Sequence, residues 1–70
     1  MITQAQIDAW FTYHAPKAGQ PERYLLLRNT AKLLAQTIVN HTPEGPDQSA
    51  ALRLLRECVM TANAAIALEE

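Results

Sequence analysis

Cysteine, glycine and long apolar runs are scarce in this chain of 70 residues, and each scarcity excludes a class of protein. The one cysteine, Cys58, cannot form a disulfide within the chain. The two histidines, His14 and His41, lie far apart, and no Cys or His pair has metal-ligand spacing, so we expect no metal ion and no cofactor. No apolar run approaches the length needed to cross a bilayer, so we expect no membrane contact.

An excess of positive charge is also missing. The formal net charge is −1 at pH 7, which excludes the broad basic field that a binder of duplex DNA or RNA needs. A lone thiol fits a reducing compartment, and the start of the chain lacks the basic residues and apolar centre of a secretion signal. We therefore expect a cytoplasmic protein.

No catalytic set is visible in the sequence. There is no glycine-rich phosphate loop, and apart from Glu69 and Glu70 no two carboxylates share a helical face. Cys58 has no histidine or aspartate one helical turn away, so we interpret it as a small buried apolar residue rather than a nucleophile. The sequence predicts a protein that is not an enzyme.

The length allows a single domain over residues 1–70 and leaves that domain marginally stable. Burial of apolar surface contributes about 100 kcal/mol for a compact chain of this size. Ordering the chain costs about 100 kcal/mol of conformational entropy, so the two terms cancel. Because no disulfide or metal ion adds stability, we expect the chain to associate with further copies of itself.

A short helix and a loop are expected in residues 1–20. Thr3 and Gln6 have the spacing of a capping box, which predicts a helix that ends near Trp10. The residues after Trp10 predict a loop that contains a proline and a glycine. This loop is the expected ligand-binding segment, for the reasons given below.

Two long helices are expected in the rest of the chain. Pro21 suits the start of a helix over residues 21–40. A turn rich in helix-breaking residues follows, and Asp47 or Ser49 is the expected cap of a helix over residues 47–68. The predicted fold class is therefore all-α, with a short N-terminal helix before a two-helix hairpin.

Matching apolar seams predict that the two long helices pack antiparallel. The seam residues recur three and four positions apart, and they are Tyr24, Leu27, Ala31, Leu34 and Ile38, then Leu52, Leu55, Val59, Ala62 and Ile66. Leu26 and Leu33 lie on the opposite side of the second helix. A helix that is apolar on two sides needs two partners, which again predicts a homo-oligomer.

The loop before residue 21 carries more chemistry than a connector needs. Tyr13, His14 and Lys17 supply a stacking ring, an imidazole and a cation beside a proline that stiffens the backbone. We interpret them as the edge of a pocket for a planar anion. The alternative is that Tyr13 and Trp10 only fasten the first helix onto the hairpin.

Three polar residues of the long helices are further candidates. Arg28 and Lys32 lie one turn apart beside the seam and are candidates to neutralise two phosphates, although exposed helical cations are more often merely solvated. Asn63 lies close to the other seam. It is a candidate partner for a base or a ribose, or alternatively a residue that fixes the helix register.

The chain resembles small phage and prophage proteins that carry the helical hairpin domain of anti-CBASS and anti-Thoeris sponges. The segments that carry the resemblance are Tyr13–Lys17, Gln20–Arg28, Ala31–Ala35 and Val59–Ala67. No one of these segments is specific, but their order and spacing together are. The resemblance extends from about Trp10 to Ala67.

This resemblance implies a function without catalysis. Members of the family oligomerise, commonly as hexamers, and sequester the cyclic di- or trinucleotides with which a host triggers its anti-phage effectors. In the best-understood branch an N-terminal tyrosine stacks on the nucleobase and a lysine of the long helix meets the phosphate. Those roles would fall to Tyr13 and Lys32, in the host cytoplasm if the protein is phage-encoded.

A second function stays open beside the sponge. A small helical adaptor or inhibitor oligomer would have the same seams and would dock a host protein, with Leu26 and Leu33 as the candidate surface.

The chain also departs from the better-known branch of the family in its last helix. Ala64 and Leu68 stand where that branch has arginines.

Overall fold

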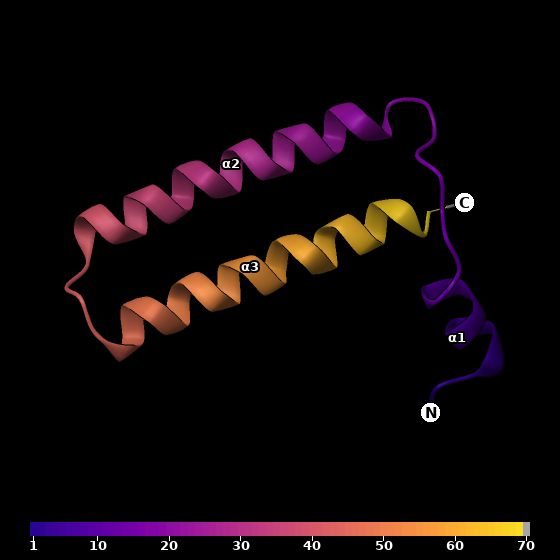
Figure 1. Cartoon of the computed structure of the whole chain (residues 1–70), viewed down its shortest axis with the longest axis horizontal. Helices are drawn as coiled ribbons and strands as arrows, with labels where there is room; N and C mark the ends of the chain where they lie inside the picture. Colours follow the sequence, from indigo (N-terminus) through magenta and orange to yellow (C-terminus); the bar gives the residue numbers. More distant parts are fainter. Residues whose placement is uncertain (70) are drawn as a thin grey trace.

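Three α-helices make up the computed structural model, which describes residues 1–69 and has no strand among them. They are α1 (Gln4–Trp10), α2 (Gln20–His41) and α3 (Pro46–Ala67). α2 and α3 lie side by side and run in opposite directions, and α1 lies beyond the open end of their hairpin (Figure 1). The predicted all-α hairpin with a short N-terminal helix is confirmed.

The two ends of α1 are closed by side chains. The Thr3 hydroxyl accepts a hydrogen bond from the Gln6 amide N–H at 3.1 Å, and the Gln6 side chain accepts one from the Thr3 N–H at 2.8 Å. These are the two bonds of the capping box that the sequence predicted. At the other end the Thr12 hydroxyl donates to the Asp8 carbonyl, which the helix leaves free.

A tight turn starts α2 at Gln20, one residue earlier than predicted. The Gln20 N–H donates to the Lys17 carbonyl at 3.1 Å, which closes a four-residue turn. Gly19 occupies its third position with φ 81° and ψ −14°, angles that suit a type II turn and favour glycine. Pro21 then lies in the first helical turn, where the missing N–H costs no hydrogen bond.

Neither Asp47 nor Ser49 caps α3, contrary to the sequence prediction. The helix begins at Pro46, and Gly45 is the residue before it. Proline at the first helical position has the required φ and lacks only an N–H that a helix start leaves unpaired, so the helix begins before the polar residues. Asp47 lies instead in the first turn, where its charge faces the positive end of the helix dipole.

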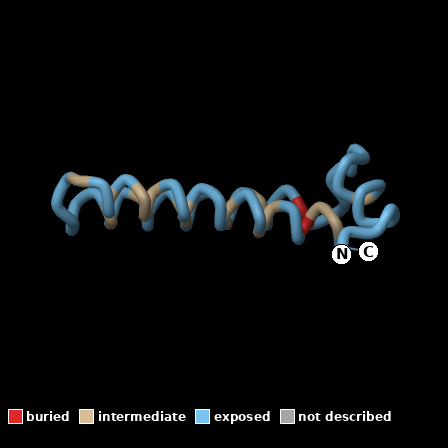
Figure 2. The backbone as a smooth tube through the Cα atoms, turned by 90° about the horizontal axis from the view of Figure 1, so that it is seen from below, coloured by how far each residue is buried: buried red, intermediate tan, exposed pale blue. Residues whose placement is uncertain are grey.

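The predicted seams form most of the interface between α2 and α3. Ile66 is the buried apolar residue, at 6% exposure, and most of the other seam residues are half-buried (Figure 2). Leu34 is an exception, because it is 48% exposed and Ala35 is half-buried beside it. Cys58 is exposed, so its interpretation as a buried residue is wrong for a single chain, since α3 has only one helix packed against it.

The chain is flat rather than globular. Its dimensions are 43 × 31 × 14 Å, and the thinnest of these is little more than one helix. The radius of gyration is 15.3 Å, whereas a compact chain of this length has about 11 Å. Its accessible surface is 5860 Å², against about 4,400 Å² for a compact monomer of this mass. One copy therefore leaves both broad faces of the hairpin uncovered.

Candidate functional site

A groove runs along the hairpin between α2 and α3. It measures about 440 Å³, within the range of small-molecule sites, and the residues that line it are Arg28, Ala31, Lys32, Ala35, Leu52, Leu55, Arg56, Val59 and Met60. We call this surface the hairpin groove. Its floor is apolar because it is the edge of the helix–helix seam, and its rim carries the cations.

Three of the groove residues are positively charged. Arg28 and Lys32 come from successive turns of α2, as the sequence predicted, and Arg56 comes from α3 across the groove. Among the described residues that line the groove, none is an aspartate or a glutamate. Cations on both walls above an apolar floor suit a ligand that has phosphates and flat apolar faces.

A second hollow lies at the open end of the hairpin, and we call it the terminal hollow. It measures about 580 Å³ and is lined by Trp10, His14, Thr61, Ala64, Ala65, Ala67 and Leu68. His14 is held in it because its Nε2–H donates to the Ala9 carbonyl at 2.6 Å. The wall from α3 is made of small and apolar side chains, so this hollow lacks the charge of the hairpin groove.

Tyr13 lines neither hollow and is 84% exposed. It belongs to the segment that crosses the open end of the hairpin (Figure 1). Its ring is therefore not used to fasten α1 onto the hairpin, which was the alternative interpretation of Tyr13 with Trp10. The ring is free to stack on another molecule.

Lys17 and Asn63 occupy different surroundings from the other candidates. The Lys17 ammonium donates to the Glu69 carbonyl at 2.9 Å, so in a single chain it bonds to the backbone rather than facing a hollow. Asn63 lies one helical turn beyond Val59 on α3, and its Oδ1 is buried without a hydrogen-bond partner among the described residues. A buried carbonyl of this kind costs stability unless something donates to it.

The structure brings together only part of the predicted site within one chain. Arg28 and Lys32 share the hairpin groove, whereas Tyr13, His14 and Lys17 lie at the open end. Lys32 is twelve residues beyond Gln20 along α2, which corresponds to about 18 Å at 1.5 Å per residue.

Two residues with defined roles were missed in the sequence. Arg56 lines the groove, but it lies off the apolar seam, and no sequence pattern separates it from the other exposed arginines. Gln20 was assigned to the loop, yet it is the buried polar residue of the chain, at 2% exposure. Its partners lie 46 and 49 positions away, and no local pattern predicts contacts at that separation.

In residues 1–69, no three His, Cys, Asp or Glu side chains come close enough to hold a metal ion. None of α1, α2 and α3 combines the length and the apolar character that crossing a bilayer requires.

The fold and the groove define a class of protein, a helical-hairpin binding module whose cations surround an apolar floor. The chain belongs to the Acb2/Tad1 hairpin domain family, whose family model matches residues 3–67. This confirms the family resemblance seen in the sequence and makes the chain a member of a family of phage cyclic-nucleotide-binding hairpins. Searches of curated proteins and of solved structures gave no match.

Proposed function

We propose that this protein is a non-catalytic sponge that assembles with other copies of itself and sequesters cyclic oligonucleotide messengers of host anti-phage defence. The observation that carries the proposal is the hairpin groove, where Arg28, Lys32 and Arg56 surround an apolar floor in a member of this family. A cyclic dinucleotide has two phosphates and two bases, and it needs cations and flat apolar contacts together.

The separation of the candidate residues supports a site shared between chains. Tyr13 belongs to the segment at the open end of the hairpin and is not among the residues that line the groove with Lys32, so a ligand in that groove does not meet the ring within a single chain. If a tyrosine stacks on the base while Lys32 meets the phosphate, the two must come from different copies. Assembly would then complete the site as well as stabilise the fold.

Exposed apolar side chains favour the same assembly. Leu26 is 67% exposed and Leu33 is 69% exposed, both on one side of α2. A second copy that covers this side would remove apolar surface from water, at about 25 cal/mol per Å². A group of the second copy could also donate a hydrogen bond to the Asn63 Oδ1, which has no partner among the described residues of one chain. A hexamer, as the resemblance implies, is the assembly that we propose.

The energetics are sufficient for tight binding. Each desolvated phosphate contact contributes about 1.5–3 kcal/mol and each base stack about 1–3 kcal/mol. Two contacts of each kind approach the roughly 12 kcal/mol of a nanomolar complex only if little is lost in ordering the pocket. A proline-stiffened loop and a rigid oligomer supply that order.

Calorimetry against a panel of cyclic di- and trinucleotides tests the proposal, combined with native mass spectrometry of the assembly. We expect at least one panel member to bind at micromolar concentration or tighter, with a stoichiometry that matches interfaces rather than isolated chains. A stable monomer, or no binding at tens of micromolar, would contradict the sponge. The adaptor that docks a host protein through Leu26 and Leu33 would then account better for the chain.

A further inference from the structure

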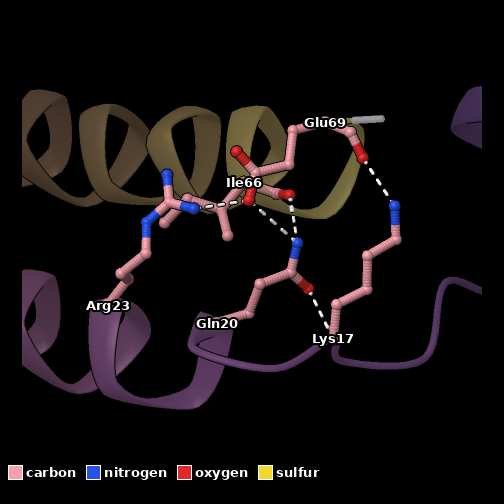
Figure 3. Close-up of polar contacts among 5 residues, drawn as sticks. All are labelled: Lys17, Gln20, Arg23, Ile66 and Glu69. Carbon is pink, nitrogen blue, oxygen red and sulfur yellow. Dashed lines mark hydrogen bonds and ion pairs between the residues drawn. The ribbon is translucent and has the colours of Figure 1, made fainter.

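The side chain of Gln20 makes hydrogen bonds with every group it offers. Its Nε2 donates to the Ile66 carbonyl at 2.9 Å and to the Glu69 carboxylate at 3.1 Å (Figure 3). Its Oε1 accepts the Lys17 N–H at 2.9 Å. An amide with both N–H groups and its oxygen bonded is fully satisfied, which is what allows it to be 2% exposed.

Two cations complete the cluster around Glu69. The Lys17 ammonium donates to the Glu69 backbone carbonyl at 2.9 Å, and the Arg23 guanidinium forms an ion pair with the Glu69 carboxylate (Figure 3). We call the five residues the Gln20 latch, and they are Lys17, Gln20, Arg23, Ile66 and Glu69. The latch joins the turn before α2 to the C-terminal end of α3.

The latch matters because the backbone of α1 lies away from the hairpin, although its Trp10 side chain lines the terminal hollow beside α3. Among the described residues, α1 has no close backbone contact with α2 or α3. Residues 11–19 are all exposed, so burial does not fix their path either. Within residues 1–69, the hydrogen bonds from the N-terminal segment and its turn to the end of α3 are those of the latch. The position of the loop therefore depends on it.

We propose that Gln20 is a positioning residue for ligand capture: its buried amide fixes the turn Lys17–Gln20 on the end of α3 and so holds Tyr13 and His14 in a binding-ready arrangement. This inference rests on the proposed function. The loop carries the ring that must meet the groove of another chain, so its path from the anchored turn decides where that ring lies. The amide suits the task, because it holds a carbonyl, a carboxylate and an N–H at once.

The expected size of the effect follows from the fraction of loops that are correctly placed. When the binding-competent state is only partly populated, the apparent dissociation constant rises by the inverse of that fraction. A variant that leaves one loop in ten in place would therefore bind about tenfold more weakly. The groove itself would be unchanged.

Gln20→Ala is the principal variant, and Gln36→Ala is its matched control. Both substitutions remove a glutamine amide from α2 and introduce the best helix former. The Gln36 side chain bonds only within the helix, to Asn40 at 3.0 Å. Three quantities are measured: affinity for the cyclic dinucleotide that binds the wild type best, hydrogen exchange of the Lys17 amide, and quencher access to Trp10, the single tryptophan.

We expect Gln20→Ala to weaken binding about tenfold or more, to speed exchange at Lys17 and to expose Trp10, with helical content unchanged. Gln36→Ala should leave all three quantities as in the wild type. Gln20→Glu should weaken binding as well, because its carboxylate would face the Ile66 carbonyl and the Glu69 carboxylate. The double variant Gln20→Glu with Glu69→Gln should recover part of the lost affinity. In it, the amide at position 69 would donate to the carboxylate at position 20, the reverse of the wild-type bond.

Binding within twofold of the wild type in Gln20→Ala, with Lys17 exchange accelerated, would overturn the positioning role and leave the sponge intact. If Gln20→Ala instead loses its helices, Glu69→Ala decides the question, because it keeps the bond from Gln20 to Ile66 and removes only the carboxylate. A folded Glu69→Ala variant with accelerated Lys17 exchange but wild-type affinity would equally overturn the role. No binding by the wild type would remove the proposed function and this inference together.

Discussion

At the scale of single residues, the effect of a cation depends on the surface it lines. Arg53 and Arg56 are three positions apart on α3, and both line a small hollow of about 220 Å³ beside the groove. Arg56 also lines the hairpin groove, and Arg53 does not. The two arginines therefore form a natural pair of test and control, with equal charge and the same helix.

Arg56→Ala should weaken binding of a cyclic dinucleotide about tenfold, the loss of roughly 1.5 kcal/mol that one charged hydrogen bond contributes. Arg53→Ala should change the affinity less than twofold, although it removes the same charge. Calorimetry at two salt concentrations checks this, because the loss at Arg56 should also reduce the salt dependence. Equal losses in the two variants would indicate a general electrostatic effect and would contradict a phosphate contact at Arg56.

The carboxylate of Glu69 gives the latch a pH dependence. The hydrogen bond from Gln20, followed by the one from Arg23, lowers the pKa of Glu69 below its ordinary value of 4.5. Because the folded pKa is the lower one, the contribution of the carboxylate to the latch is complete above pH 4.5 and is lost as the pH falls through the lowered pKa.

We therefore expect quencher access to Trp10 to stay constant from neutral pH to about 4.5 and to rise below it. The Glu69 carboxyl carbon, followed by NMR, should titrate over the same range as the fluorescence. Glu69→Gln is the control, since it has no carboxylate to protonate and should show no step of its own there. A titration midpoint of the Glu69 carboxyl carbon above pH 4.5 would contradict the lowered pKa of Glu69.

At the scale of helices and turns, Gly19 determines how the loop enters α2. Its φ of 81° is a conformation that L-residues other than glycine rarely adopt, and nothing lies within 4 Å of an added Cβ. Gly19→Ala should therefore destabilise the fold by about 1–2 kcal/mol through the backbone alone. Thermal unfolding measures this, and D-alanine at position 19, introduced by chemical synthesis, should restore the loss because it favours positive φ. Equal destabilisation by both would contradict a conformational cause.

The outer side of α2 is the next element with a testable role. Leu33→Asp places a charge at a position that is 69% exposed in one chain, so a monomer should tolerate it easily. In an assembly that covers this side, the buried charge should dissociate the copies and lower the melting temperature. Leu33→Met keeps an apolar side chain of similar volume and should retain the assembly. Native mass spectrometry distinguishes the outcomes, and an intact assembly of Leu33→Asp would exclude this side as the interface.

The helices could be predicted from the sequence because their signals are local. The capping box at Thr3, the prolines in the first turns of the long helices and the seams at three and four positions all act within a few residues of one another. The start of α3 was placed too late because Pro46 is a stronger start than a polar cap further on. The roles of Gln20 and Arg56 could not be predicted from local patterns. Gln20 bonds to a carbonyl near the end of the other long helix, and Arg56 matters because of the side of the seam that it lies on.

At the scale of the whole molecule, one flat chain presents a groove whose lining lacks the Tyr13 ring of the proposed site. Figure 2 shows how thin the hairpin is and how little of it is buried. The terminal hollow, with Ala64 and Leu68 in its wall, offers no lysine or arginine to a phosphate. Under the proposed function, capture of a nucleotide would therefore depend on what a second copy brings to the hairpin groove.

Mixing two inactive variants tests whether the site is shared. Tyr13→Ala and Lys32→Ala should each weaken binding about tenfold or more, through loss of a stack and of a phosphate contact. In a random mixture of the two, a site that takes Tyr13 from one copy and Lys32 from another is intact in about one case in four. Calorimetry of the mixture, unfolded and refolded together, should therefore recover high-affinity binding at about a quarter of the wild-type capacity. A site built within one chain would recover none, because every copy carries one of the two substitutions.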